Sequence, residues 1–166
     1  EFFQNIDKKN YSSMIFYSKK IIISPLTTHI PISEVHKFYK NRNFIYNKIK
    51  TINEALISDF NIKNPKIILT GLNPHAGEEG KIGIEENKYF KPQINKLLQN
   101  NINVSGPLSA DMIFNNKNIK KYDCFVCAYH DQALIPFKLI SKFNSINYTG
   151  SLSIIRLSPT HGTAYD

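Results

Sequence analysis

The chain has 166 residues, of which 42% are apolar, and its 21 Lys+Arg against 13 Asp+Glu give a formal net charge of +8. This length predicts one domain, the apolar fraction excludes a disordered chain, and no apolar run approaches the ~20 residues that cross a membrane. Two cysteines exclude a disulfide scaffold and favour a reducing compartment, so we expect a cytoplasmic protein without a membrane partner.

Three elements are predicted in the first part of the chain. Ile21-Ile22-Ile23 is a β-branched run that ends at Ser24-Pro25, which is typical of a buried strand followed by a loop. Ser33 followed by Glu34 predicts a short helix over residues 33–39. From residue 43 to 60 apolar residues recur every three or four positions, which predicts a helix with one buried face: Ile45, Ile49, Ile52, Leu56 and Phe60.

The second part of the chain alternates strands and helices. Residues 66–70 predict a buried strand, 71–83 a Gly-rich loop, and 92–100 a helix with Ile94, Leu97 and Leu98 facing inward. Ser105-Gly106-Pro107 predicts a turn, and Ser109 the cap of a short helix over 110–114. Residues 124–128, 146–149 and 152–157 predict further strands, whereas the segment before Lys19 has no clear pattern. The alternation predicts an α/β fold, with helices packed on a mixed, largely parallel sheet.

The positive charge is spread along the chain. Lysines are not gathered into one block, and arginine occurs only at Arg42 and Arg156. No nucleic-acid motif accompanies this charge, so we expect an anionic small molecule such as a phosphate ester, and no nucleic acid, as the partner.

Three of the five histidines follow predicted strands. His29 lies six residues after Ile23, His75 six after Leu69, and His130 two after Ala128. Because ligands of open α/β sheets bind at the carboxyl ends of the strands, the three imidazoles are predicted to share one divalent cation with open coordination positions. The alternative is that each histidine is a separate surface residue.

The loops around these histidines contain further polar candidates. Small residues flank His75, which would let a ligand approach the backbone, and Glu78 is predicted to hydrogen-bond the second nitrogen of that imidazole. Asp131 is placed to orient His130, to contact substrate or to move a proton. Asp111 is either a site carboxylate or a helix-capping residue.

Two basic residues and two cysteines complete the candidates. Lys138 is either a phosphate contact or acid/base group or an ordinary exposed lysine, and Arg156 suits a bidentate clamp on phosphate or carboxylate. Cys124 and Cys127 form a C-x-x-C on a predicted strand, where positions i and i+3 point to opposite faces, so both are interpreted as packing residues.

Five motifs occur in an order that resembles the 4-hydroxythreonine-4-phosphate dehydrogenase family of the pyridoxal phosphate pathway. They are Thr27-Thr28-His29-Ile30-Pro31, Gly71-Leu72-Asn73-Pro74-His75-Ala76-Gly77-Glu78, Ser105-Gly106-Pro107-Leu108-Ser109-Ala110-Asp111, Tyr129-His130-Asp131-Gln132 and His161-Gly162-Thr163-Ala164. The resemblance covers nearly the whole chain, and the second and fourth motifs are the most specific.

The resemblance implies a fold, an assembly and a set of ligands. The family has a two-domain fold like isocitrate and isopropylmalate dehydrogenases, and its members are homodimers with active sites at the subunit interface. The matching metal ligands are His29, His75 and His130, for Zn, Mg or Co. The matching substrate contacts are Lys138, Asn147 and Arg156, with Asp111 and Asp131 lining the site. No cofactor-binding residue is assigned.

The activity implied is NAD- or NADP-dependent oxidation of the C3 hydroxyl of 4-phosphooxy-L-threonine. The product, 2-amino-3-oxo-4-phosphooxybutanoate, then decarboxylates to 3-amino-2-oxopropyl phosphate. Metal chemistry agrees with this reaction, because a divalent cation lowers the pKa of a bound hydroxyl and polarises the new ketone.

The chain departs from the family pattern in several places. It begins at Glu1 without Met and stops at Asp166, so we expect residues 1–166 to be the central and C-terminal part of a longer two-domain enzyme, inactive by itself. Ala133 stands where the family usually has Gly, and Thr160 where Asp precedes His-Gly-Thr. Residues 148–155 lack the usual Gly-Leu-Pro, which bears on cofactor binding.

Three alternatives stay open at this point. One is a paralogue that oxidises a related phosphorylated hydroxy acid such as 4-phospho-threonate or 4-phospho-erythronate. Another is a truncated metal- or phosphate-binding module without catalysis. The last is a basic nucleic-acid-binding domain, which would show salt-dependent binding to random DNA.

Overall fold

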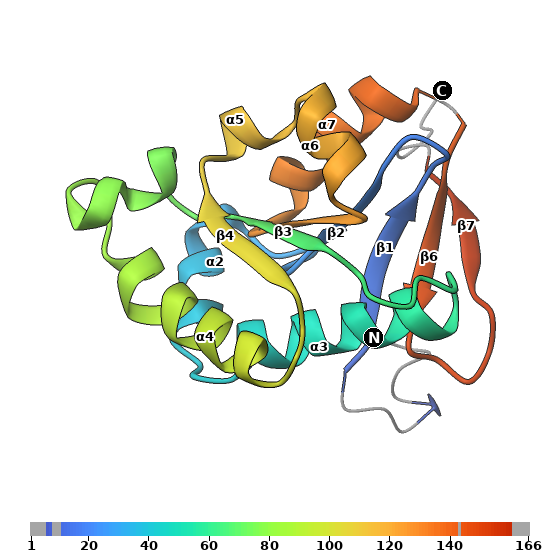
Figure 1. Cartoon of the computed structure of the whole chain (residues 1–166), viewed down its shortest axis with the longest axis horizontal. Coiled ribbons are helices and arrows are strands. Elements are labelled where there is room, and N and C mark those ends of the chain that lie inside the picture. Colours follow the sequence, from blue (N-terminus) through green and yellow to red (C-terminus); the bar gives the residue numbers. More distant parts are fainter. Residues whose placement is uncertain (1–5, 8–10, 143, 161–166) are drawn as a thin grey trace.

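A seven-stranded sheet with helices on both faces forms the molecule (Figure 1). The computed structural model describes residues 6–7, 11–142 and 144–160. The strand order is β4-β3-β5-β2-β1-β6-β7. The strands are β1 Ser13–Tyr17, β2 Ile22–Pro25, β3 Ile67–Thr70, β4 Val104–Leu108, β5 Cys124–Cys127, β6 Ile146–Gly150 and β7 Leu157–Pro159.

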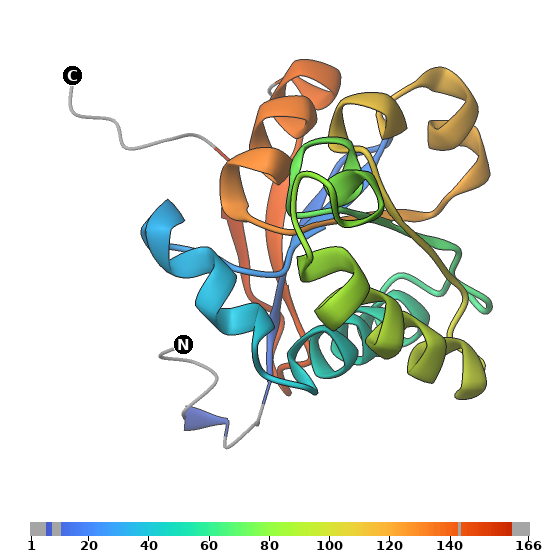
Figure 2. The same cartoon turned by 90° about the vertical axis from the view of Figure 1, so that its left-hand side faces the viewer.

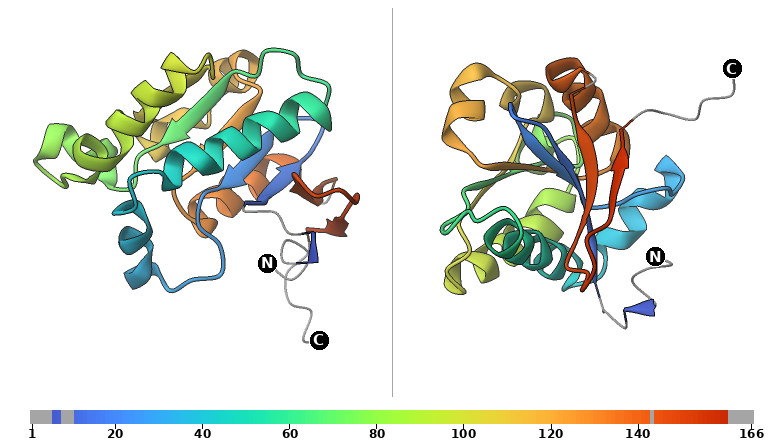
Figure 3. Two further views of the ribbon diagram at one scale, coloured as in Figure 1. Left: turned by 90° about the horizontal axis from the view of Figure 1, so that it is seen from below. Right: turned by 90° about the vertical axis from the view of Figure 1, so that its right-hand side faces the viewer.

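The helices form two layers around this sheet. The α-helices are α2 Ile32–Tyr39, α3 Phe44–Ser58, α4 Lys91–Gln99, α5 Ala110–Ile113, α6 Asn116–Lys121 and α7 His130–Ser141. Two irregular helical segments are η1 Pro74–Gly80 and η2 Glu86–Phe90. Helices α3 and α4 lie side by side on one face (Figure 3), and α5, α6 and α7 lie on the other (Figures 1 and 2).

The sheet is mixed. Strands β4, β3, β5 and β2 are parallel, whereas β1, β6 and β7 continue the sheet in antiparallel pairs. The α/β class and the mixed sheet predicted from the sequence are confirmed, and the parallel part comprises four of the seven strands.

Apolar side chains of the parallel strands alternate between two cores. On β5, Cys124 and Val126 pack into the core under α3 and α4, whereas Phe125 and Cys127 pack into the core under α7. Both faces of these strands are covered, which explains why they read as continuous apolar runs. The two cysteines are buried, unpaired and on opposite faces, so their interpretation as packing residues is confirmed.

Helix α3 confirms the helical spacing predicted for residues 43–60. Ile45, Ile49, Ile52 and Leu56 are fully buried. The helix ends at Ser58, so Phe60 lies beyond it and packs against the core from a loop. In α4 the buried residues are Ile94 and Leu97, whereas Leu98 is 49% exposed, contrary to prediction. Leu97 and Leu98 are about 100° apart around the helix axis, and the buried face of α4 includes Leu97 but not Leu98.

Several other boundaries differ from the sequence prediction. Residues 105–107 form no free turn, because they lie within β4. Strand β7 covers Leu157–Pro159, and not residues 152–157, since only those three residues pair with β6. Helix α2 begins at Ile32 after Pro31, and Ser33 does not cap it. Strand β1, η2, α6 and the helical extent of α7 were not predicted.

Within the described part of the chain, no helix combines the length and the apolar character needed to cross a bilayer.

Candidate functional site

The three candidate histidines follow three neighbouring parallel strands. His29 comes after β2, His130 after β5 and His75 after β3, and β5 lies between the other two in the sheet. The carboxyl ends of these strands meet at the same edge. The order of the sheet therefore places His130 centrally, with His29 on one side and the His75 loop on the other.

His29 and His130 are direct neighbours. Their ring centroids are 5.5 Å apart, with 49° between the ring planes. The Nδ1 atom of His130 lies 2.8 Å from Oδ1 of Asp131. An imidazole held through one nitrogen by a carboxylate presents the other nitrogen to a ligand, an arrangement typical of metal-binding histidines.

His75 lines a neighbouring pocket of about 250 Å³ together with Asp111, Tyr129 and Gln132. Tyr129 directly precedes His130, so this pocket adjoins the His29–His130 pair through α7. His75 and Asp111 are both exposed side chains. The pocket therefore has an imidazole and a carboxylate within reach of a small polar molecule.

These residues provide only part of what a divalent-cation site needs. No group of three or more His, Cys, Asp or Glu side chains among the described residues lies close enough to hold one ion. The chemistry of the donors nevertheless suits such an ion, since two imidazoles face each other and one is already oriented by Asp131. The third imidazole is on the adjoining loop.

The backbone of the His75 loop is unusual. Five successive residues, from His75 to Glu79, have φ between 43° and 76°, which is the left-handed region. His29 also has a φ of 52°. Left-handed backbone costs about 1–2 kcal/mol for each residue with a Cβ, and such strain is concentrated at functional sites. Two of the three histidines are therefore held in a costly conformation.

Two predicted roles near these residues are not realised. Glu78 is exposed, and among the described residues it makes no hydrogen bond to His75. Ser109 occupies the N-cap position of α5, but its hydroxyl forms no capping bond. Asp111 lies in the first turn of α5 and lines the pocket with His75.

Gln132 is a connecting residue whose role the sequence did not reveal. Its Oε1 accepts hydrogen bonds from Thr70 Oγ1 (2.6 Å) and from the backbone N–H of Ala128 (2.7 Å). Its Nε2 donates to the carbonyl of Gly71 at 3.0 Å. One amide side chain thus joins the ends of β3 and β5 to the start of the His75 loop.

The three candidate substrate contacts lie on other elements. Lys138 is exposed on α7, about 12 Å along the helix axis from His130. Asn147 is on β6 opposite Phe16, whose side chain packs against α7 through Phe137, so register places Asn147 on the α7 face of the sheet.

Asn147 and Arg156 share the β6–β7 hairpin. Arg156 Nη1 donates to Thr149 Oγ1 at 3.0 Å, and Thr149 is on the same side of β6 as Asn147. The Oδ1 atom of Asn147 is buried and, among the described residues, accepts no hydrogen bond. The structure thus places Asn147 and Arg156 on one hairpin, whereas the three histidines follow β2, β3 and β5.

The nucleophilic groups near the strand ends are inactive by burial. Desolvation raises the pKa of the Cys124 and Cys127 thiols, so both stay protonated at neutral pH. Burial also raises the pKa of Tyr39, whose hydroxyl donates to the carbonyl of Ala128. These groups support the strand ends but offer no thiolate or phenolate to a substrate.

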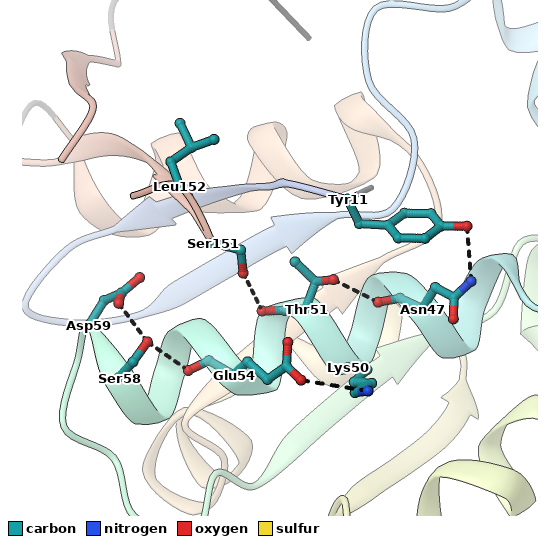
Figure 4. A pocket seen from close by; sticks show the side chains of 9 residues that line it. All are labelled: Tyr11, Asn47, Lys50, Thr51, Glu54, Ser58, Asp59, Ser151 and Leu152. Atoms are coloured by element: carbon teal, nitrogen blue, oxygen red, sulfur yellow. Dashed lines mark hydrogen bonds and ion pairs between the residues drawn. The ribbon is translucent and has the colours of Figure 1, made fainter. Parts of the chain in front are cut away.

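A second pocket, of about 440 Å³, lies over α3 (Figure 4). Its polar side chains bond to one another or to backbone: Asn47 Nδ2 donates to Tyr11 Oη at 2.9 Å, and Ser151 Oγ donates to the carbonyl of Thr51 at 3.3 Å. None of the predicted site residues lines it. The motif His161-Gly162-Thr163-Ala164 lies outside the residues that the structure describes.

Known proteins resemble this chain over nearly all of its length. A family model described as "Pyridoxal phosphate biosynthetic protein PdxA" matches residues 1–166. A 4-hydroxythreonine-4-phosphate dehydrogenase of Aquifex aeolicus is 42% identical over 158 residues, covering 95% of this chain and 48% of the relative. That of Bradyrhizobium diazoefficiens is 39% identical over 153 residues, covering 92% and 44%.

Solved structures also resemble most of this chain. A crystal structure of 4-hydroxythreonine-4-phosphate dehydrogenase from Klebsiella pneumoniae superposes with a TM-score of 0.88 at 31% identity, over 98% of this chain and 48% of that one. A terephthalate 1,2-cis-dihydrodiol dehydrogenase from Burkholderia xenovorans has a TM-score of 0.76 at 27% identity, over 87% and 45%.

The chain spans about half the length of the curated relatives it matches. Family model, sequence relatives and solved structures nevertheless agree over nearly all of its residues. The chain belongs to the PdxA family of pyridoxal phosphate biosynthetic proteins.

Proposed function

We propose that the protein is an NAD- or NADP-dependent dehydrogenase that oxidises 4-phosphooxy-L-threonine in pyridoxine 5'-phosphate biosynthesis. The observation that carries this proposal is the placement of His29, His130 and His75 after three adjacent parallel strands, in a chain of the PdxA family. The names of the relatives supply the substrate.

In the proposed reaction, the C3 hydroxyl loses its proton and the C3 hydrogen leaves as hydride to the nicotinamide. The product, 2-amino-3-oxo-4-phosphooxybutanoate, then loses CO₂ to give 3-amino-2-oxopropyl phosphate. A divalent cation (Zn, Mg or Co), when bound, supplies a Lewis acid that stabilises negative charge on the substrate oxygen.

The chain's own residues have separate tasks in this proposal. His29, His75 and His130 hold the cation, and Asp131 keeps Nδ1 of His130 engaged so that its other nitrogen is presented. Asp111, beside His75, is the carboxylate placed to contact the substrate. We assign the phosphate and carboxylate groups of the substrate to Lys138, Asn147 and Arg156, which orient it for hydride transfer.

The assembly proposed with this activity is a cytoplasmic homodimer whose active sites lie at the subunit interface. This assembly is what the resemblance of the motifs to the 4-hydroxythreonine-4-phosphate dehydrogenase family implies, and the chain belongs to that family. The exposed face of α7 agrees with a covered surface, because Ile135 and Leu139 on that helix are 63% and 75% exposed.

The test uses the full-length protein with NAD or NADP, 4-phosphooxy-L-threonine and Zn²⁺, Mg²⁺ or Co²⁺. We expect reduced nicotinamide absorbance to appear, and we expect His29→Ala, His75→Ala and His130→Ala each to abolish both turnover and metal binding. His36→Ala, an exposed histidine of α2, is the matched control and keeps both. Absence of turnover with every metal, or stoichiometric metal in all three site variants, would refute the proposal.

A paralogous activity is the second candidate. One solved structure of this fold is named as a dehydrogenase of a cis-dihydrodiol, which shows that similar chains act on other hydroxylated substrates. The corresponding substrates here are 4-phospho-threonate and 4-phospho-erythronate. Competition among the three phosphorylated substrates decides, since the preferred one has the highest kcat/KM.

A further inference from the structure

A buried carboxylate lies behind the turn that carries His75. Glu86 is 1% exposed, at the start of η2, and it has no ion-pair partner among the described residues. Its Oε1 accepts hydrogen bonds from the backbone N–H groups of Leu72 (2.8 Å) and Asn73 (2.7 Å). Buried polar groups need such hydrogen-bond partners, because burial takes away the water that would otherwise bond to them.

Asn73 connects this carboxylate to a second one. Its Nδ2 donates to Oε2 of Glu86 and to Oε2 of Glu85, both at 2.9 Å. Two acceptors fix which end of the amide points at them, because the flipped amide would aim its own oxygen at two carboxylates. Asn73 is two residues before His75, so this bond network holds the chain immediately before the imidazole.

The same carboxylate also touches the chain after His75. A Cβ added to Gly77 would lie 2.5 Å from Glu86 Oε2, and one added to Gly83 would overlap the amide of Asn73. The small residues of this loop therefore make room for Glu86 and Asn73. At Gly77 this corrects the prediction that the small residues beside His75 let a ligand approach the backbone, because the side chain of Glu86 takes that space.

We infer that Glu86 is the positioning residue of the His75 loop: its buried carboxylate braces the left-handed turn on both sides of His75 and sets the direction of that imidazole. The role of His75 as a ligand rests on the proposed function, whereas the bracing of the turn does not. Glu85 assists by accepting a hydrogen bond from Asn73 Nδ2, which fixes the orientation of that amide.

Three variants of the full-length protein test this inference. Glu86→Gln keeps the size of the side chain but turns its NH₂ group toward the NH₂ group of Asn73. A flip of the Asn73 amide would not relieve this clash, because Asn73 Oδ1 would then face the carboxylate of Glu85. The double variant Glu85→Gln/Glu86→Gln allows the Asn73 amide to flip, because Asn73 Oδ1 can then accept hydrogen bonds from the NH₂ groups of both new glutamines. Glu79→Gln removes the same charge from an exposed position of the same loop and is the matched control.

The probes are Co²⁺, followed by its affinity and visible spectrum, and amide hydrogen exchange of residues 71–80. We expect Glu86→Gln to weaken Co²⁺ binding by about 10- to 100-fold, to alter the spectrum and to speed exchange in the loop. We expect Glu79→Gln to match the parent protein, and the double variant to recover most of the affinity. If Glu86→Gln does not fold, Asn73→Ser, which removes the same amide bonds, takes its place.

The outcomes separate this inference from the proposed function. Parent-like Co²⁺ affinity together with parent-like loop exchange in Glu86→Gln would overturn the inference. A parent protein that binds no Co²⁺ would refute the proposed metal site, while faster exchange confined to residues 71–80 in Glu86→Gln would still support the bracing role. Equal losses in Glu79→Gln would also overturn it, because loop charge alone would then explain the effect.

Discussion

At the scale of single residues, the side chains near the site are defined by their hydrogen-bond partners more than by their residue types. The sequence pointed to Asp131 and Glu78 as partners of neighbouring imidazoles, yet only Asp131 meets one. Glu86, which no pattern singled out, has the most enclosed carboxylate of the loop. The reason is that a partner far along the chain depends on how the loop closes, which residue spacing does not encode.

Tyr148 supplies a pH-dependent contribution at this scale. Burial, followed by its bond to Asp59 at 2.6 Å, raises the pKa of the Tyr148 phenol to about 12. The ordinary pKa of tyrosine, about 10, applies in the unfolded chain. Because this pKa is higher in the folded chain than in the unfolded chain, the protonated phenol contributes its full stabilisation of the fold below a pH of about 10. That contribution is lost as the pH rises through about 12.

We therefore expect the melting temperature of Tyr148→Phe to fall less between pH 9 and 12 than that of the parent protein, as measured by circular dichroism. Tyr122 provides a control of opposite sign, because a hydrogen bond with Ser105 lowers its pKa. Tyr122→Phe should steepen the same fall. Identical pH profiles for the parent protein and Tyr148→Phe would contradict the assignment.

At the scale of elements, local periodicity located the helices and strands that bury one clear face or a continuous run. Helix α3 and strands β2, β3 and β5 are of this kind. The sequence does not predict β1, because buried and half-buried residues do not alternate regularly along that strand. It does not predict η2 either, because the helical turns of that segment are irregular. The ends of elements, such as β7, depend on which neighbour they pair with.

Gln132 joins helix α7 to the ends of β3 and β5, so we expect it to contribute to the stability of the fold. Gln132→Leu would leave the hydroxyl of Thr70 and the carbonyl of Gly71 without this partner. We expect the free energy of unfolding to fall by about 1–3 kcal/mol, as measured by urea denaturation.

Gln99→Leu makes the same change at an exposed position of α4 and should alter the free energy of unfolding by about 0.5 kcal/mol or less. A Gln132→Leu variant as stable as Gln99→Leu would show that the connecting amide does not stabilise the strand ends.

At the scale of the whole molecule, the sheet is stabilised by apolar layers on both faces. Ile52 of α3 is fully buried in the layer under α3 and α4, whereas Ile57 of the same helix is 44% exposed. We expect Ile52→Ala to lower the free energy of unfolding by about 2–5 kcal/mol.

Ile57→Ala is the matched control in the same helix and should cost clearly less, since water already reaches its side chain. Both values come from denaturant unfolding followed by circular dichroism. Equal costs for the two variants would show that the α3 layer is not packed as described.

The α/β class, the core strands, helix α3 and the family can be predicted from the amino-acid sequence, because these depend on short apolar patterns and local motifs. The position of β5 between β2 and β3 is known from the folded chain alone, and it brings His130 beside His29 and leaves His75 on the adjoining loop. The hydrogen bonds of Glu86 behind His75 are likewise seen in the folded chain alone. Strand order and the closure of a loop arise from contacts between residues distant in the chain, and such contacts are set by packing and not by local spacing.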